Sequence, residues 1–318
     1  MQAMRSYVGL TDGDWFKMLA AQPSLEEINF WQPGGNRRFS ALSPGELFLF
    51  KLHAPDRAIA GGGVFTYSTI LPVSLAWEAF DIGNGATSLM EMRKRIEKYR
   101  REAAKPHEDY TIGCVLLSQP FFLQREEWIE APEDWHENIV QGKTYASDSI
   151  LGRRLLQQVQ DAIRLHDVRI ETENGKGSAK SKQAEPRYGS TTMVRPRLGQ
   201  GAFRIVVTDA YARRCAVSGE KVLPVLEAAH IRPYGQGGAH EVQNGILLRS
   251  DLHTLFDRGY LTITPVHHIE VSKRIHSEYE NGKEYYALHG RKIFLPRRSA
   301  DLPTEENLQW HNENVFAG

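Results

Sequence analysis

Residues 227–259 read EAAHIRPYGQGGAHEVQNGILLRSDLHTLFDRG and decide how the second half of the chain folds. The apolar run that ends at His230 predicts a strand, and a glycine-broken loop follows it. A second apolar run precedes residues 249–259, which have the pattern of a short helix. We therefore expect the order strand, loop, strand, helix.

Polar side chains stand at the ends of these elements. His230 closes the first strand, and Asn244 follows the loop. Ser250 is a natural helix cap, which places His253 in the first turn and Asp257 four residues later on the same face. An imidazole and a carboxylate at this spacing can reach one divalent cation, and the donor types suit Mg²⁺, Mn²⁺, Zn²⁺ or Ni²⁺. An unperturbed imidazole titrates near ~6.5, so the histidine that ends the strand is available as a base at neutral pH.

The fingerprint AAHI…NGILL…H..FD.G resembles an HNH endonuclease of the ββα-metal type, over residues 215–263. The resemblance implies that His230 is the general base that activates water and that Asn244 orients this histidine and its loop. It implies that His253 and Asp257 hold a cation that stabilises the transition state and the leaving 3′-oxygen. Phosphodiester hydrolysis requires these two kinds of help, an activated water and a cation where charge develops.

The sequence departs from the family pattern in two places. Many members carry Asp or His directly before the base as a further metal ligand, whereas Ala229 stands here. The resemblance then implies a cation held by His253, Asp257, water and the substrate phosphate, with Glu227 a weak candidate for assistance. Many members also brace the fold with Cys-x-x-Cys zinc knuckles, whereas Cys215 stands alone and predicts a fold held by packing. Arg232 and Arg249 are candidate phosphate contacts, although arginines are common beside any surface loop.

Each site residue also has a structural interpretation. A lone histidine at a strand end is usually structural, and the Asn244–Gly245 pair alone would be a plain turn. Asp257 could instead act as a partner of a ligand or bond the end of its helix. The co-occurrence of the three signature residues in order favours the nuclease interpretation.

The first half of the chain reads as mixed α/β. Short β-branched or aromatic runs bounded by Gly, Pro and Asp predict strands at 45–53, 58–70 and 110–123. The glycines at 61–63 predict a bulge or a close backbone approach. Helices are expected at 86–104 and 148–171. The first has a cap at Thr87 or Ser88 and a stripe formed by Leu89, Met92, Ile96 and Tyr99.

Residues 28–65 read INFWQPGGNRRFSALSPGELFLFKLHAPDRAIAGGGVF, and this region resembles the PUA-like superfamily, in particular its EVE, YTH and SRA-related members. The resemblance covers residues 25–145 and implies a small β-barrel with a pocket for a flipped or modified base. Flat aromatic faces stack on an extruded base at about 1–3 kcal/mol each. The candidates for this pocket are Trp31, Phe39, Tyr67 and Trp77, although most aromatic residues of any chain are core.

A basic stretch separates the two halves. From Asn174 to Arg214 there are nine Lys or Arg against two acids, enough positive charge to attract phosphates if it lies on one face, or else a solvated linker. Arg195 and Arg197 are its candidate DNA contacts. We predict a recognition domain at 1–172, a flexible linker at 173–200 and a nuclease domain at 201–318.

The composition of the whole chain limits the alternatives. It has 318 residues, zero formal net charge and 41% hydrophobic residues, which is typical of a folded two-domain protein. No apolar run approaches the ~20 residues that span a bilayer, and no signal-peptide core is present, so we expect a cytoplasmic protein. Two distant cysteines exclude a four-cysteine zinc site within one chain.

The sequence therefore predicts an α+β protein with an N-terminal PUA-like β-barrel domain with flanking helices and a C-terminal ββα-metal nuclease domain. Its expected activity is cleavage of double-stranded DNA that carries modified cytosine, with a divalent metal, as in modification-dependent restriction enzymes. With one active centre per chain, cleavage of both strands needs two chains or two sequential nicks, and we expect a homodimer on DNA. A sequence-specific nuclease for unmodified DNA and a non-catalytic nucleic-acid-binding protein are the alternatives.

Overall fold

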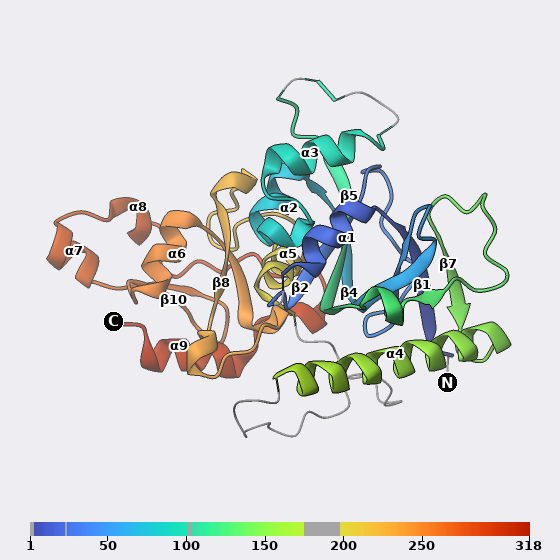
Figure 1. Cartoon of the computed structure of the whole chain (residues 1–318). Coiled ribbons are helices and arrows are strands. Elements are labelled where there is room, and N and C mark those ends of the chain that lie inside the picture. Colours follow the sequence, from blue (N-terminus) through green and yellow to red (C-terminus); the bar gives the residue numbers. More distant parts are fainter. Residues whose placement is uncertain (1–2, 23, 101–103, 106, 175–197) are drawn as a thin grey trace. The chain divides into compact units, whose positions relative to one another are not determined.

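A computed structural model describes residues 3–22, 24–100, 104–105, 107–174 and 198–318, without the side chains of 167–168 and 170–174 (Figure 1). The chain forms two compact units, residues 1–196 and 197–318. Most of the predicted linker, including Arg195 and Arg197, lies outside the described residues.

A seven-stranded mixed sheet is the centre of the N-terminal unit. Its strands follow the order β2-β5-β4-β3-β1-β7, with β6 paired to β4; β1 and β3 are parallel and the other pairs antiparallel. Among the described residues no pairing joins β2 to β7, so the predicted closed barrel is not confirmed. The strands are β1 (Arg5–Thr11), β2 (Glu27–Gln32), β3 (Leu47–Leu52), β4 (Ala58–Pro72), β5 (Thr111–Phe122), β6 (Ile129–Glu130) and β7 (Gly142–Ala146).

The glycines of β4 allow two neighbouring backbones to come close. A Cβ at Gly61 would lie 2.3 Å from the Phe121 carbonyl oxygen, and one at Gly62 would lie 2.6 Å from that of Phe48. The pairing of β4 with β5 also shifts between Gly62 and Val64. The predicted bulge and close approach are both present, because no larger residue fits between these strands.

Helices flank this sheet. They are α1 (Gly13–Ala20), α2 (Val73–Phe80), η1 (Asp81–Asn84), α3 (Leu89–Glu97), η2 (Arg125–Glu127) and α4 (Ile150–Asn174). Side chains cap the first turns of α1, α3 and α4. Asp12 accepts from the backbone amides of Asp14 and Trp15, and Ser88 caps α3. The expected helix at 86–104 is shorter than predicted, since α3 ends at Glu97. Tyr99 therefore lies outside the helix, where its hydroxyl donates to Asp12.

The C-terminal unit is built around a two-stranded hairpin covered by helices. Its elements are α5 (Gln200–Ala210), η3 (Leu223–Val225), β8 (Leu226–His230), η4 (Tyr234–Gln236), η5 (Val242–Asn244), β9 (Gly245–Arg249), α6 (Ser250–Asp257), β10 (Leu261–Ile263), β11 (Ile269–Val271), α7 (Arg274–Tyr279), α8 (Lys283–Tyr286), η6 (Ser299–Asp301) and α9 (Glu305–Asn314). The predicted order strand, loop, strand, helix is present as β8, β9 and α6. Arg249 rather than Ser250 occupies the cap position, one residue before the predicted cap.

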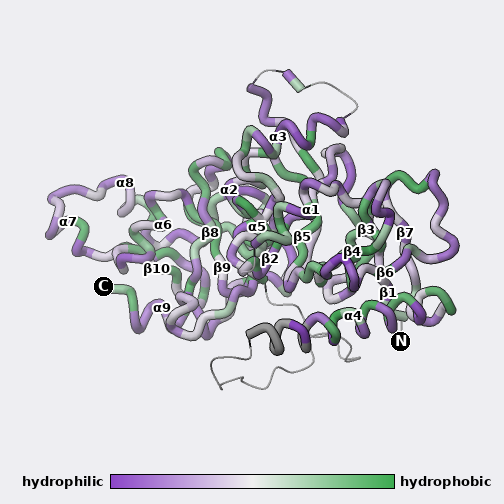
Figure 2. Tube along the Cα trace, viewed as in Figure 1, coloured by the Kyte–Doolittle hydropathy of each residue, from purple (hydrophilic) through white to green (hydrophobic). Residues whose placement is uncertain are grey.

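Apolar side chains from both strands of the hairpin and from α5 and α6 form the core of this unit. Phe203, Ile246, Leu252 and Phe256 are fully or almost fully buried in it. Figure 2 shows hydrophobic residues alternating with hydrophilic ones along the chain trace of both units. Within the described ranges, no helix has the length and apolar character needed to cross a membrane.

Candidate active site

The β8–β9 hairpin brings His230 and Asn244 to the same end of the two strands. His230 pairs with Gly245, and the backbone amide of Ile231 donates to the Asn244 carbonyl at 2.9 Å. The two residues are fourteen positions apart in the sequence, and the antiparallel pairing of their strands brings them close together in space. The histidine therefore leaves the strand where the loop begins, and the asparagine stands where the loop ends.

The Asn244 side chain holds this loop in place. Its Oδ1 accepts from the Arg232 amide at 2.9 Å, and its Nδ2 donates to the carbonyls of Arg232 at 2.9 Å and Ala239 at 3.0 Å. The residue is 2% exposed, so these bonds satisfy a buried amide that would otherwise destabilise the fold. The described contacts of this side chain go to the loop backbone.

The His230 imidazole lies against an aromatic ring and a second histidine. It stacks on Phe203 of α5, with ring centroids 3.9 Å apart and planes 9° from parallel. Its Nε2 lies 2.9 Å from Nδ1 of His240. Burial, followed by the charges of His240 and His253, lowers the pKa of His230 to about 4. The expected value near ~6.5 is therefore too high, because burial disfavours the imidazolium; the ring is neutral at pH 7.

His253 lies between two carboxylates. Its Nδ1 is 2.6 Å from Oε2 of Glu227 on β8, and its Nε2 is 3.3 Å from Oδ2 of Asp257, one turn further along α6. Partial desolvation, and then the neighbouring Glu227 carboxylate, raise the pKa of Asp257, whereas His253 acts to lower it. The two carboxylates and the imidazole thus form one cluster.

The cluster has donors of the type that a divalent cation needs. Adjacent ligands of an octahedral cation with bonds of about 2.1 Å lie about 3 Å apart, and the Nε2–Oδ2 separation of 3.3 Å between His253 and Asp257 is close to this value. Glu227 bonds the other ring nitrogen, as carboxylates that orient metal-binding histidines do. Among the described residues, however, no group of three or more His, Cys, Asp or Glu is arranged to hold a metal. These two residues could therefore supply part of a coordination shell, with water and a substrate phosphate completing it.

Ala229, where the family often has a ligand, belongs to the hydrophobic core. It is 0% exposed and pairs with Ile246. Cys215 is also buried in this core, where its Sγ accepts from the backbone amides of Ser218 and Arg249. Burial of Cys215 in the core thus stabilises this part of the fold, a role that zinc knuckles have in many HNH endonucleases.

Both arginines near the hairpin already have partners. Arg249 forms a bidentate pair with Asp251, at 2.6 and 2.7 Å, and Asp251 in turn holds the pKa of this guanidinium above its usual range. The Nε of Arg232 donates to the Gln236 carbonyl at 2.8 Å, and its guanidinium lies 5.4 Å from the centre of the Trp310 ring. A DNA phosphate would have to share or replace these partners.

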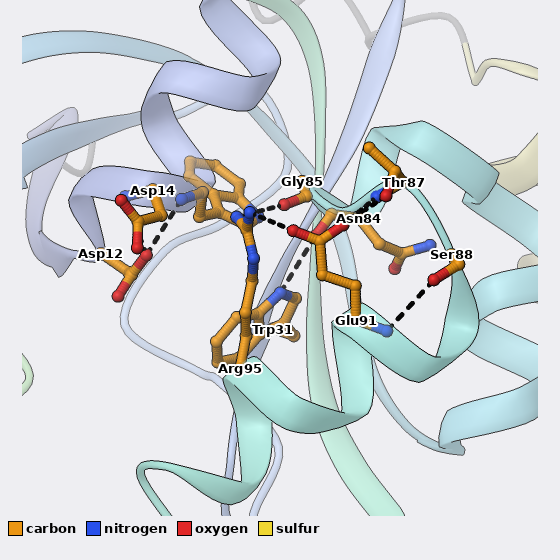
Figure 3. Close-up of polar contacts among 10 residues, drawn as sticks. Asp12, Asp14, Trp31, Asn84, Gly85, Thr87, Ser88, Glu91 and Arg95 are labelled. Carbon is orange, nitrogen blue, oxygen red and sulfur yellow. Dashed lines mark hydrogen bonds and ion pairs between the residues drawn. The ribbon is translucent and has the colours of Figure 1, made fainter.

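In the N-terminal unit, Trp31 is part of a buried hydrogen-bond network (Figure 3). The ring is 8% exposed, and its Nε1 donates to the Asn84 carbonyl at 3.0 Å. The Asn84 side chain accepts from Asn29, and Arg95 donates to the next carbonyl, that of Gly85, at 2.7 Å. The ring as described offers little surface for a base, and its proposed contact with a base stays a prediction.

Glu91 joins this network to the start of α3. Its carboxylate accepts from the amide and hydroxyl of Thr87 and pairs with Arg95, as Figure 3 shows. These bonds, first the one from the Thr87 hydroxyl, lower the pKa of Glu91 to about 2. The carboxylate is therefore ionised at neutral pH and fixes the guanidinium that bonds the Gly85 carbonyl.

The other predicted pocket aromatics are half-buried and come from separate elements. Phe39 contacts the rings of Tyr7, Phe48 and Phe65. Phe65 and Tyr67 pair with successive residues of β5, Leu117 and Leu116, so alternation places them on opposite faces of the sheet. Phe39 thus packs on the face opposite Tyr67. Trp77 lies on α2. A base pocket formed by all four stays a prediction.

The structure also adds residues that the sequence reasoning missed. His240 and Phe203 contact the candidate base directly. The only available signal for His240 was a histidine inside the polar loop between the two signature positions. Phe203 looked like an ordinary residue of an amphipathic helix.

Comparison with known families gives a match in the C-terminal unit. Residues 215–264 match a family model described as HNH endonuclease, and the match contains His230, Asn244, His253 and Asp257. The C-terminal unit carries an HNH endonuclease domain. The matched domain is of an endonuclease family, which supports an enzymatic function for this unit.

Solved structures give weaker likenesses. The modification-dependent TagI restriction endonuclease is 24% identical with a TM-score of 0.26, and the match covers 36% of this chain and 37% of that chain. ASCH from Zymomonas mobilis is 9% identical with a TM-score of 0.32, covering 48% of this chain and 94% of its own. A mutant of that protein is 11% identical, with a TM-score of 0.32 and coverage of 48% and 96%. No curated protein matches the chain.

Proposed function

We propose that this protein is a modification-dependent DNA endonuclease that cleaves double-stranded DNA bearing modified cytosine, such as 5-methylcytosine or 5-hydroxymethylcytosine. The observation that carries the nuclease part is the placement of a neutral His230 beside the loop held by Asn244, in the same small unit as the His253–Asp257 pair. A buried neutral imidazole can take a proton from water at neutral pH.

The residues divide the chemistry among themselves. His230 accepts the proton of the attacking water, and Asn244 fixes the loop that follows this base. His253 and Asp257 would hold Mg²⁺ or Mn²⁺, or alternatively Ni²⁺ or Zn²⁺, with Glu227 orienting the imidazole. The bound cation supplies electrostatic stabilisation of the charge that develops on the phosphate and on the leaving 3′-oxygen. Arg232 and Arg249 are proposed to contact neighbouring phosphates.

The reading of the modified base is assigned to the N-terminal unit. Its resemblance to PUA-like domains supports this assignment, and Trp31, Phe39, Tyr67 and Trp77 are its proposed base contacts. A domain that extrudes and reads a base, fused to a nuclease module of low specificity, makes cleavage dependent on modification. With one proposed catalytic centre in the described part of each chain, cleavage of both strands takes either two chains or two sequential nicks; we propose a homodimer on DNA, with Arg195 and Arg197 contacting phosphates.

Digestion of one plasmid prepared with cytosine, 5-methylcytosine, 5-hydroxymethylcytosine or 6-methyladenine tests this function, with Mg²⁺, Mn²⁺, Ni²⁺ and Zn²⁺ compared. We expect cleavage only of DNA with modified cytosine. Equal cleavage of all four plasmids would identify a nuclease for unmodified DNA. Binding without cleavage under every metal condition would identify a non-catalytic DNA-binding protein.

A further inference from the structure

The contact between His230 and His240 limits how the candidate base can work. The two ring nitrogens, Nε2 of His230 and Nδ1 of His240, lie 2.9 Å apart, which is hydrogen-bond distance. A bond between two neutral imidazoles needs one N–H donor and one lone pair, so only two arrangements exist. Each arrangement fixes which nitrogen of His230 can accept a proton.

In the first arrangement, His240 donates from Nδ1 to Nε2 of His230. The neutral His230 ring then carries its own proton on Nδ1, and its single lone pair is already used, so the ring cannot act as a base. In the second arrangement, Nε2–H of His230 donates to His240, and the lone pair stands on Nδ1. The structure assigns no partner to Nδ1 of His230 among the described residues, which leaves this atom available to a water.

We propose that His240 is a positioning residue for the reaction, and that it acts by accepting a hydrogen bond from Nε2–H of His230. This inference rests on the proposed function of His230 as the general base. His240 thereby selects the tautomer whose Nδ1 can take the proton from water. When an O–H bond of the water breaks and the Nδ1–H bond forms, the resulting imidazolium keeps its Nε2–H bond to His240. The water oxygen forms a bond to phosphorus, and the bond from phosphorus to the 3′-oxygen breaks, so that the 3′-oxygen leaves with the electron pair and takes a proton from solvent.

The loop is built in a way that holds His240 at this position. The carbonyl of the preceding residue, Ala239, accepts from the Asn244 side chain at 3.0 Å. The ring of Tyr234 stacks on His240, with centroids 4.6 Å apart and planes 14° from parallel. Gly238 is required because a Cβ there would lie 1.9 Å from the Arg232 carbonyl oxygen. The Asn244 side chain therefore affects the base indirectly. It bonds the backbone of the loop that carries His240, and His240 contacts His230.

His230 is held from its other side by Phe203, which stacks on the imidazole plane. Stacking restricts the tilt of the ring but offers no group that distinguishes its two nitrogens. Among the described residues, the contact between Nε2 of His230 and Nδ1 of His240 is the one that makes that distinction. The two neighbours therefore have different effects, which separate variants can resolve.

Three variants of the full chain test the proposal. His240→Phe keeps an aromatic ring against Tyr234 but has no acceptor, His240→Ala removes both, and His240→Asn places an amide oxygen near the position of Nδ1. We expect kcat on modified DNA to fall about 10- to 100-fold in the Phe and Ala variants, with KM for DNA changed much less, and the Asn variant to recover most of the lost rate. Equal rates for the Phe variant and the wild type would overturn the proposal, as would an Asn variant no faster than Ala.

A spectroscopic measurement tests the same proposal without any cleavage. Long-range ¹H–¹⁵N correlation spectra of the wild-type protein at pH 7 report which nitrogen of each histidine carries the proton. We expect Nε2–H on His230, and a shift of this signal in His240→Phe. A proton on Nδ1 of His230 would overturn the proposal. If the wild type cleaves no DNA, the proposed function fails, whereas the tautomer measurement still decides the role of His240.

Discussion

Nε2 of His253 and Oδ2 of Asp257 lie 3.3 Å apart on one face of α6, one helical turn from each other. The spacing is set by the helix, which brings residues i and i+4 side by side. Glu227 reaches the other nitrogen of the same imidazole from β8, at 2.6 Å. A helix and a strand thus meet in one acidic cluster, with donor atoms suited to a divalent metal.

Asp257→Asn removes the charge of one of the two proposed ligands while keeping the size of the side chain. We expect the dissociation constant for Mn²⁺, measured by isothermal titration calorimetry, to rise at least about 10-fold, because amide oxygen is a weaker ligand than carboxylate. Glu305→Gln, an exposed residue in the first turn of α9, is the matched control and should bind Mn²⁺ like the wild type. Unchanged affinity in the Asp257 variant would remove this residue from the metal site.

Glu227 is predicted to act through His253 rather than as a ligand. Glu227→Ala should weaken Mn²⁺ binding about 10-fold, since the loss of an orienting partner typically costs 10- to 100-fold. Glu227→Gln should bind Mn²⁺ much more tightly than the Ala variant, because its amide oxygen still accepts from Nδ1–H. If Gln and Ala weaken binding equally, Mn²⁺ binding depends on the negative charge of Glu227 and not on its hydrogen bond to His253, which would contradict this prediction.

The low pKa of His230 predicts an unusual pH profile. Burial and the charges of His240 and His253 lower this pKa to about 4, so the neutral base exists above that pH and is lost below it. The acid limb of kcat/KM, which reports the free enzyme, should therefore lie well below the ~6.5 of an ordinary histidine. In the complex with DNA, the phosphate charge favours the imidazolium, so the acid limb of kcat should lie at higher pH.

Single-turnover and steady-state rates between pH 4.5 and 8, at saturating Mn²⁺, check this prediction. The wild type should show little loss of kcat/KM down to pH 5.5. A limb near pH 6.5 that persists in kcat/KM would show that the imidazole is solvated in the active protein.

Lys51 in β3 is a buried cation without a carboxylate among its described contacts. It is 5% exposed, its Nζ lies 4.9 Å from the centre of the Trp135 ring, and its hydrogen bond to the Leu52 carbonyl is long, at 3.4 Å. Burial, and then the charge of Arg57, lower its pKa. The folded state therefore binds fewer protons than the unfolded state just below pH ~10.4, and stability falls as the pH decreases through that window.

Replacement of Lys51 by Met should consequently raise stability at pH 7. We expect the Tm of the N-terminal transition in calorimetry to rise by about 2–4 °C, because an unpaired buried charge is replaced by an apolar side chain of similar length. Lys17→Met on the exposed face of α1 is the control, with little change expected. A lower Tm in the Lys51 variant would show that this ammonium has a stabilising partner.

The sequence predicted the C-terminal site better than the N-terminal unit, for physical reasons. The expected adjacency of His253 and Asp257 is confirmed because it depends only on helical periodicity. The position of His240 depends on how a thirteen-residue loop folds back, which Asn244 sets through bonds across the loop. No local pattern contains that information.

In the N-terminal unit, a shift of one residue in strand pairing separates two of the predicted pocket residues, Phe39 and Tyr67. The register between β4 and β5 shifts between Phe65 and Tyr67, and alternation then separates Phe39 from Tyr67. The low pKa of His230 could not be predicted either, because it arises from burial, including stacking on Phe203, and from the charges of His240 and His253, which the fold brings near it. Local patterns thus predicted the elements, and long-range packing decided their chemistry.

The most direct test compares the wild type with His230→Ala on two duplexes of identical sequence, one with cytosine and one with 5-methylcytosine or 5-hydroxymethylcytosine. Binding is measured by fluorescence anisotropy and cleavage by single-turnover assay with Mn²⁺. We predict that the wild type cleaves only the modified duplex, and that the variant binds this duplex with unchanged affinity but cleaves it at least about 100-fold more slowly. Cleavage by His230→Ala at the wild-type rate, or equal cleavage of both duplexes by the wild type, would contradict the account.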